Sequence, residues 1–311
     1  MAEVLEQLVK SAPILIASAA ETEGGVTEGP LWHPAGFLTF VRLDLSELVQ
    51  WDADHGARVI RTGTGNGNGC TFDREGRMVI CEAANRRVSR TEPDGSTTVI
   101  AEVFRGCHLN SPNDVVCASD GTIYFTDPQG FNAPADGDLG FSGIYRAGLG
   151  GELDLVAECD YPNGLAFSPD ESVLYVANTR ANARCNAAIA NGDLCAHRAL
   201  LAFDVKSDGQ LGPARRLVDM TSGGPGHPDG LKVDKDGRVY CTGPGGVWVI
   251  DPAGRHLATI ELPEEPVRNL AFGGPSLTTL FLTAARSVYA MEMTVPGLPG
   301  HPYRAVGSDA N

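Results

Sequence analysis

Short apolar stretches alternate with tight acidic turns along most of this chain. In NDVVCASDGTIYFTDP, which starts at Asn113, an apolar stretch is followed by the turn SDG and then by a second stretch in which apolar and polar residues alternate. NGLAFSPDESVLYVANT from Asn163 and DGLKVDKDGRVYCTGPGGVWVIDPAG from Asp229 repeat the same order. Strands of this length, joined by turns rich in Gly, Asp and Pro, predict antiparallel β-hairpins.

This pattern occurs six times. The segments start at Glu28, Asn68, Asn113, Asn163, Asp229 and Asn269, so that successive starts are 40, 45, 50, 66 and 40 residues apart. A four-stranded unit every 40 to 50 residues is typical of the blades of a β-propeller. Helical periodicity is sustained only over residues 2–10. We therefore predict an all-β fold, a six-bladed β-propeller that comprises residues 1–311 as one domain, with a helical or extended lead-in over about 1–20.

The longest interval, between Asn163 and Asp229, contains RANARCNAAIANGDLCAHRA, which we expect to be an insertion on one face. Cys185 and Cys195 lie close enough in this segment for a disulfide, but their spacing does not decide whether they pair. The eight cysteines form no C-x-x-C motif. The apolar run 12–20 is too short to span a bilayer, and the acidic residues before it are atypical of a signal peptide. These features predict a cytoplasmic protein with free thiols.

Composition changes this picture in two respects. A length of 311 residues suggests two domains, but the repeats account for it as one ring of small units. The 38 glycines, about 12% of the chain against ~7% in typical proteins, agree with many tight turns. The net charge of −15 disfavours nucleic acid and anionic membranes as partners and is compatible with a site for a cation. We expect a small-molecule substrate and a monomer or small homo-oligomer.

The first residues of the repeats form the candidate site. Equivalent positions of successive blades lie at the same height around the central axis of a propeller, so these carboxylates and amides are expected to face one channel. Hard divalent cations, Ca²⁺ above all, bind carboxylate and amide oxygens together. Asn-Gly, Asn-Asp and Asp-Gly are also ordinary turn dipeptides. For Asn68 and Asn269 the alternative to a place in the metal site is a structural role. The prediction of a central metal site rests on the periodic recurrence.

From about Glu28 to Met293 the chain resembles the family of senescence marker protein 30, gluconolactonase and luciferin-regenerating enzyme. The motifs that carry the resemblance are E-G-P-x-W at 28–32, N-S-P-N-D-V at 110–115, Y-F-T-D-P at 124–128, P-N-G-L-A-F-S-P-D at 162–170, H-P-D-G-L-K-V-D at 227–234 and N-L-A-F-G-G at 269–274. The resemblance implies a six-bladed lactonase with a central divalent metal. It also implies that Glu28, Asn163 and Asp229 are the metal ligands, and that Asn113 is a further ligand or a substrate contact. Ca²⁺ is the expected ion, with Zn²⁺, Mn²⁺ and Mg²⁺ as alternatives.

The first repeat departs from the family pattern. Many bacterial members carry a sequence similar to L-L-F-S-D-I, whereas this chain has LTFVRLDLSELVQWD, which places Arg42 where an Asp is common. Either Arg42 faces an anion of the substrate or the register differs, and the alternative is a surface arginine on a strand edge. The departure puts the sugar specificity in doubt more than the metal site.

Opening a lactone requires a polarised carbonyl, a nucleophilic water and a proton acceptor. A divalent ion supplies the polarisation, and Asp229 is the candidate catalytic residue, either as general base toward water or as a nucleophile that forms an acyl-enzyme. His33, next to E-G-P-L-W, and His227, next to P-D-G, are expected at the channel mouth. His108 is a third candidate for substrate contact, with a loop or strand-end role as the alternative for each histidine.

Motifs of other enzyme classes are missing from the sequence. There is no H-E-x-x-H zinc motif, no G-x-S-x-G nucleophile elbow and no Walker loop. We therefore predict a metal-dependent hydrolase that opens a lactone or related cyclic ester. The alternatives are another metal-assisted reaction, such as hydrolysis of other esters or organophosphates, and a non-catalytic propeller that binds a metal or another ligand.

Overall fold

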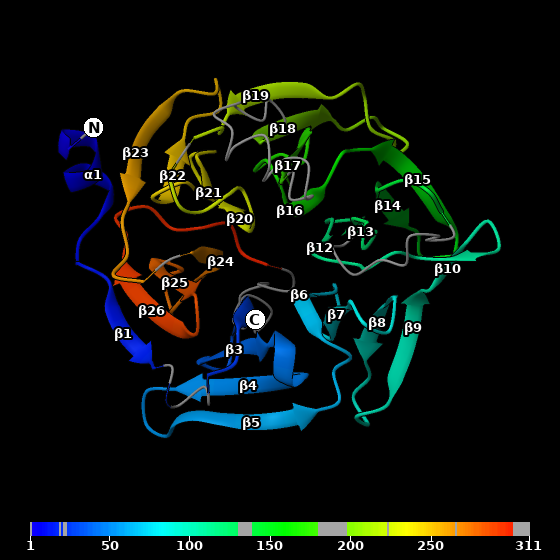
Figure 1. Ribbon diagram of the computed structural model, residues 1–311, viewed down its shortest axis with the longest axis horizontal. Helices are drawn as coiled ribbons and strands as arrows, with labels where there is room; N and C mark the ends of the chain where they lie inside the picture. The colour runs from blue at the N-terminus through cyan, green and yellow to red at the C-terminus, as the bar shows by residue number, and fades with distance from the viewer. Residues whose placement is uncertain are drawn as a thin grey trace, which may run out of the picture.

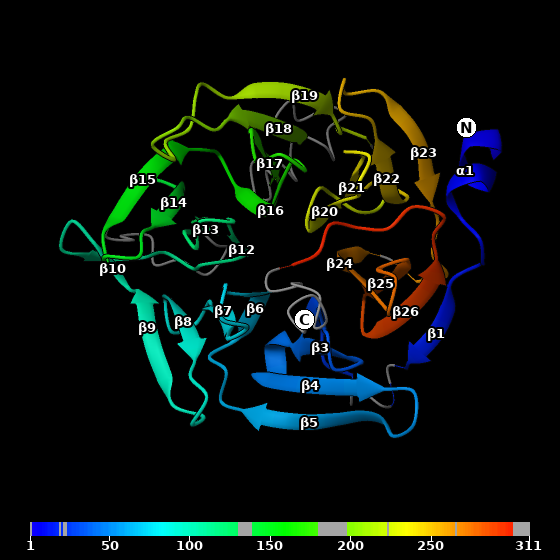
Figure 2. The same cartoon turned by 180° about the vertical axis from the view of Figure 1, so that it is seen from behind.

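Six four-stranded antiparallel sheets surround a central axis in the computed structural model (Figures 1 and 2). The structure describes residues 2–18, 20, 24–129, 139–179, 198–222, 224–264 and 266–300. Each sheet is one blade, and its innermost strand is β2, β6, β12, β16, β20 or β24. The prediction of a six-bladed β-propeller is confirmed.

Each predicted repeat supplies the inner strands of one blade. Blade 1 contains β2 (Thr27–His33), β3 (Phe37–Arg42), β4 (Glu47–Asp52) and β5 (Gly56–Thr62); blade 2 contains β6 (Gly67–Phe72), β7 (Met78–Glu82), β8 (Arg87–Thr91) and β9 (Thr97–Ala101); blade 3 contains β12 (Val115–Cys117), β13 (Ile123–Asp127), β14 (Gly143–Ala147) and β15 (Leu153–Glu158). Blade 4 contains β16 (Pro162–Phe167), β17 (Val173–Asn178), β18 (Ala199–Asp204) and β19 (Arg215–Asp219); blade 5 contains β20 (Leu231–Val233), β21 (Val239–Gly243), β22 (Gly246–Ile250) and β23 (His256–Ile260). A 3₁₀ turn (Leu43–Leu45) and a small ribbon, β10 (Val103–Phe104) with β11 (Cys107–His108), lie in connections.

Blade 6 is closed by the N-terminal lead-in. Three of its strands are consecutive, β24 (Val267–Gly273), β25 (Thr279–Ala284) and β26 (Ser287–Glu292), and the outer strand is β1 (Ile14–Ala17). Ile14 pairs with Ala290, and Leu15 pairs with Tyr289. The lead-in starts with the helix α1 (Ala2–Leu8), which lies outside blade 5 next to β23 (Figure 1). The ring is therefore joined by segments from the two ends of the described chain.

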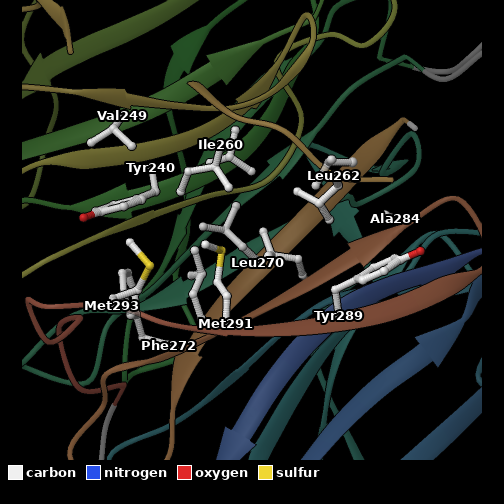
Figure 3. Packing of buried hydrophobic residues seen from close by; sticks show 14 of the residues in the cluster. Tyr240, Val249, Ile260, Leu262, Leu270, Phe272, Ala284, Tyr289, Met291 and Met293 are labelled. Atoms are coloured by element: carbon white, nitrogen blue, oxygen red, sulfur yellow. The ribbon is translucent and has the colours of Figure 1, made fainter. Parts of the chain in front are cut away.

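Apolar side chains fill the spaces between neighbouring blades. Figure 3 shows one such cluster, in which Tyr240, Val249 and Ile260 of blade 5 face Leu270 and Met291 of blade 6. A blade is covered on both faces by its neighbours, which explains why its strands contain continuous apolar runs. The free energy of burial therefore holds the blades in a closed ring.

The expected insertion before Asp229 falls largely on residues 180–197, which lie outside the described residues together with Cys185 and Cys195. The six other cysteines are free thiols. Among the described helices, none has the length and apolar character needed to span a bilayer.

Candidate functional site

The inner strands are distorted where the repeats begin. In blades 1, 2 and 4 the register with the second strand shifts at Glu28, Asn68 and Asn163, because the inner strand carries one extra residue there. Such a β-bulge bends the strand and changes the direction of the side chain at that point. The shift gives the first residue of each repeat a position distinct from the regular alternation of the strand.

The glycines that follow these residues permit close contact between blades. A Cβ on Gly69 would lie 2.1 Å from Asp114 Oδ1, and one on Gly164 would lie 2.4 Å from the Asp229 carbonyl oxygen. The Gly69 amide donates to the Asn113 carbonyl at 2.8 Å, and the Gly164 amide donates to the Asp229 carbonyl at 3.0 Å. Neither glycine has a positive φ. The Asn-Gly dipeptides at these two positions are therefore contacts between blades, and the turn interpretation is wrong for them.

The same kind of contact shows that the sixth repeat starts one residue earlier than predicted. Gly230 donates its amide to the Arg268 carbonyl at 2.7 Å, which places Arg268 in the position that Asn113 and Asp229 occupy in their blades. Val267 pairs with Ala284, as Thr27 pairs with Arg42 in blade 1. Arg268, and not Asn269, is thus the first residue of blade 6. No glycine follows it, so the sequence offered Asn269 as the better match.

We call the six equivalent positions the ring residues; they are Glu28, Asn68, Asn113, Asn163, Asp229 and Arg268.

The carboxylates of Glu28, Asp114 and Asp229 lie near one another. Glu28 is 4% exposed, and its Oε2 accepts hydrogen bonds from the Gly29 amide at 2.6 Å and from Asn269 Nδ2 at 2.9 Å. Burial, together with the negative charges of Asp229 and Asp114, raises the pKa of Glu28 to about 8 despite these two hydrogen bonds. Asn269 therefore orients Glu28, in agreement with the structural role considered for it.

Asp114 is the carboxylate that sequence reasoning missed. It is buried, and Oδ1 accepts the Val115 amide at 2.8 Å, whereas Oδ2 has no hydrogen-bond partner among the described residues. Burial raises the pKa of Asp114 even though the charge of Lys232 acts in the opposite direction. The sequence could have indicated Asp114, because the third repeat has N-D where the second and fourth have N-G.

Asp229 and Asn163 are buried and fixed by threonines of second strands. The Asp229 amide donates to Thr242 Oγ1 at 2.9 Å, and Thr126 Oγ1 donates to the Asn163 carbonyl at 2.7 Å. Asn163 Nδ2 donates to Thr179 Oγ1 at 3.4 Å, and the described chain places no donor on its Oδ1. These threonines were also missed, although the T of Y-F-T-D and Y-C-T-G marks Thr126 and Thr242.

The N-S-P-N-D segment is anchored by Asp127. The carboxylate of Asp127 accepts the Asn110 amide at 2.8 Å and the Ser111 amide at 2.7 Å. Burial raises its pKa to about 7, and the two amides limit the rise. Asn113, which is half-buried, donates its amide to the Thr126 carbonyl at 2.8 Å. The segment thereby holds Asn113 at its ring position.

The structure separates the three predicted histidines. His227 lies beside the site, with Nε2 3.4 Å from Asp229 Oδ2. His33 ends β2, whereas Glu28 is the second residue of this strand, and the five residues from Glu28 to His33 span about 16 Å. The imidazole of His33 stacks on Phe37 at 4.4 Å, so the expectation that it lines the same mouth as His227 is wrong. His108 is exposed in β11, and its carbonyl accepts Arg86 Nη2 at 3.3 Å.

Arg42 is neither on the surface nor unpaired. Its side chain is 2% exposed in β3, and Nη2 forms an ion pair with Glu47 of β4. The interpretation of Arg42 as a surface arginine is therefore wrong. The predicted substrate contact would have to compete with this ion pair.

An apolar cavity of 390 Å³ lies in the channel beyond the ring residues. Phe72, Phe167 and Phe272 line it, with Lys232 on one wall and Leu298 on another. The segment after β26 reaches the channel between blades 5 and 6 (Figure 2), and the Leu298 amide donates to the Val233 carbonyl at 3.0 Å. The channel therefore has a polar end and an apolar end.

The donor set at the polar end fits a hard divalent cation. Within the described residues no three His, Cys, Asp or Glu side chains meet as ligands of one ion, so a site there requires the Asn163 amide oxygen as well. Mixed carboxylate and amide oxygens are the set that Ca²⁺ prefers. The raised pKa of Glu28 and the unpartnered Asp114 Oδ2 show that the protein alone does not compensate these carboxylates.

Known proteins are similar to this chain in sequence and in fold. Residues 26–286 match the family described as SMP-30/Gluconolactonase/LRE-like region. The chain belongs to this family. It is 31% identical to a gluconolactonase of Zymomonas mobilis over 290 residues, covering 84% of this chain and 77% of that one. It is 27% identical to the pentonolactonase XacC of Haloferax volcanii over 277 residues, covering 87% and 85%.

A solved structure within the family gives the same result. A gluconolactonase from Xanthomonas campestris superposes on this chain with a TM-score of 0.79 at 30% identity, covering 93% of this chain and 92% of that chain. The resemblance expected from the motifs is thus confirmed at the level of the family and the fold.

Proposed function

We propose that this family member is a lactonase, which hydrolyses a sugar lactone or a related cyclic ester at the ring residues with the help of a bound divalent cation. The observation that carries the proposal is the convergence of Glu28, Asp229 and Asp114 in a buried site where the pKa of Glu28 is about 8. Buried carboxylates without a counter-charge are costly, and a divalent cation offsets that cost. The gluconolactonase and pentonolactonase relatives support lactones as the substrate class.

Glu28, Asn163 and Asp229 would hold the cation, with Ca²⁺ as the first candidate and Zn²⁺, Mn²⁺ and Mg²⁺ as alternatives. When bound, the cation supplies Lewis-acid polarisation of the lactone carbonyl. Asn269 and the Gly29 amide keep the Glu28 carboxylate in place through their hydrogen bonds to Oε2. Asn113 and His227, at the edge of the site, are the substrate contacts.

Asp229 takes the proton from the attacking water in the proposed reaction. His227, at 3.4 Å, can relay that proton to the alkoxide that leaves when the ring C–O bond breaks. In the other route Asp229 itself attacks the carbonyl and an acyl-enzyme forms, which water then hydrolyses. Acid quenching during turnover, followed by mass spectrometry, distinguishes the routes, because only the second leaves acyl mass on Asp229.

The test of the function is a pH-indicator assay over a panel of lactones. Protein stripped with a chelator is measured alone and after addition of each of the four cations. We expect hydrolysis of aldonolactones that the chelator abolishes and that one cation restores. Cation binding without hydrolysis of any lactone would contradict the lactonase assignment and would favour another ester, an organophosphate or a non-catalytic binding propeller.

A further inference from the structure

Arg268 is the one cationic residue among the ring residues. Its neighbours in the ring are Asp229 of blade 5 and Glu28 of blade 1, because β24 packs between β20 and β2. The Gly230 amide, which donates to the Arg268 carbonyl, fixes its backbone at the same height as Asp229. A long basic side chain therefore starts between the two carboxylates proposed to hold the cation.

The guanidinium of Arg268 forms no hydrogen bond or ion pair with the described residues. Its Nε is buried without a hydrogen-bond partner, and no carboxylate of the described residues lies within ion-pair distance of it. The Nε atoms of Arg42 and Arg146 are likewise buried and unpartnered, but these two arginines form ion pairs with Glu47 and Asp154. Leaving a buried charged donor without an acceptor costs about 1–3 kcal/mol. Unlike Arg42 and Arg146, Arg268 has no carboxylate partner among the described residues that could offset this cost.

The charges of the site indicate the kind of ligand. Glu28 and Asp229 would hold the divalent cation in the proposed function, Asp114 is a third negative charge close to them, and Lys232 acts on Asp114 as a further positive charge. These charges balance without Arg268. The cation-loaded site therefore has one positive charge left over, which a neutral sugar lactone does not compensate.

We propose that Arg268 is a specificity-determining residue that binds an anionic substituent of the substrate, so that the preferred substrates are lactones with a carboxylate outside the ring that opens. The planar guanidinium presents parallel N–H donors that match the two oxygens of a carboxylate. The inference rests on the proposed lactonase function. It concerns substrate choice and leaves the hydrolytic step itself to Asp229.

The test compares an aldonolactone with the matching aldarolactone, in which a carboxylate replaces the terminal hydroxymethyl group. For the native chain we expect a higher kcat/KM with the aldarolactone. R268Q lowers kcat/KM for the aldarolactone by about 10- to 100-fold, mainly through KM, because charge-assisted hydrogen bonds are lost. It lowers kcat/KM for the aldonolactone much less than for the aldarolactone, because the aldonolactone has no carboxylate for the guanidinium to bind. R268K restores only part of the preference, since an ammonium lacks the bidentate geometry.

Equal losses on both lactones in R268Q, or no preference in the native chain, would overturn the proposal. R216Q is the matched control, because Arg216 is an exposed arginine paired with Asp219 on an outer strand. Calorimetric titration of the native chain and R268Q with the open-chain aldarate and aldonate gives a readout that needs no turnover. If no lactone is hydrolysed but aldarate still binds more tightly than aldonate in an Arg268-dependent way, only the lactonase function fails. Equal affinities would overturn the role of Arg268 by itself.

Discussion

The propeller contains two sets of buried acidic residues that differ in their surroundings. At the polar end of the channel, Glu28, Asp114 and Asp229 lie close together, and no arginine of the described chain pairs with them. At the far ends of the strands, Asp73, Asp234 and Asp251 each begin a D-x-x-G-R turn. The difference separates acids that hold the fold together from acids that need a ligand.

The turn acids are satisfied within their own hairpins. Asp234 Oδ1 accepts the amides of Asp236 and Arg238, both at 2.9 Å, and Oδ2 accepts Arg238 Nη1 at 3.0 Å. Asp73 and Asp251 repeat this arrangement with Arg77 and Arg255. Burial raises the pKa of Asp251, but the hydrogen bonds and charge of Arg255 outweigh it and lower the pKa below its ordinary value. In Glu28 burial and the neighbouring negative charges outweigh the hydrogen bonds, so its pKa is raised.

The largest expected effect is on catalysis. D229N removes the proton acceptor and one cation ligand, and we expect kcat/KM for lactones to fall by at least about 10³-fold. D251N, in a turn of the same blade, should leave kcat/KM of the folded protein unchanged. Full activity in D229N, measured by the indicator assay, would show that the acids at the polar end of the channel do not differ in function from the acids of the turns.

The second effect is on stability. D234A removes four hydrogen bonds to a fully buried carboxylate, including one from the Tyr240 hydroxyl at 3.2 Å. We expect a loss of roughly 3 kcal/mol, or about 6–12 °C in Tm, with no change in kcat of the folded fraction. A Tm near that of the native chain would show that the turn acids are dispensable.

The third effect is a pH dependence of the chain stripped of cations. Unfolded Glu28 releases its proton near pH 4.5, whereas the folded group keeps its proton up to about pH 8. The folded state therefore binds more protons in this window, and its stability falls as the pH rises from about 4.5 to about 8. E28Q removes the titration, so its Tm should exceed that of the native chain at the upper end of this window and should depend less on pH across it.

The control for E28Q is the native chain with Ca²⁺ added. A bound cation favours the ionised carboxylate, so calcium should raise the Tm of the native chain at the upper end of the window and have less effect on E28Q. Melting curves of the two proteins that respond equally to pH and to calcium would contradict the proposed counter-charge.

The smallest effect concerns the exposed arginine of a turn. Arg255 is 79% exposed, although its Nε lies 2.6 Å from Asp251 Oδ2. Because exposed ion pairs contribute little, R255Q should cost no more than about 1 kcal/mol in the free energy of unfolding. Urea denaturation measures this value, and a larger loss would show that the ion pair and not the backbone amides holds the Asp251 turn.

The sequence allowed the repeats, the class of fold and the positions of Glu28, Asn163 and Asp229 to be predicted, because the motifs recur at a fixed place in each blade. Arg268 was missed by this reasoning. The register of β24 is fixed by hydrogen bonds to blade 5, which a comparison of repeats does not contain. Asp114 was missed because it occupies the position where other repeats have glycine, and the space for its side chain is provided by Gly69 of the preceding blade.

Contacts between distant segments were also beyond the sequence pattern. The sequence pattern predicts a helical or extended lead-in over about 1–20, with an apolar run too short to span a bilayer, but it does not predict that β1 in this lead-in pairs with β26. His33 and His227 both stand next to motif residues, but the direction of each strand decides at which end of the channel they lie. Periodicity along the chain predicts blades; the closing of the ring depends on tertiary pairing.

The pairing of β1 with β26 has a consequence for synthesis on the ribosome. Ile14 leaves the ribosome more than 270 residues before its partner Ala290, which corresponds to a delay of roughly 15–60 s at ~5–20 residues per second. During this time the apolar strand is without its partner, and the last blade cannot be completed until the final strand has emerged. A contact of such high sequence separation is slow to form. Nascent chains of this propeller are therefore expected to depend on chaperones that cover the first strand.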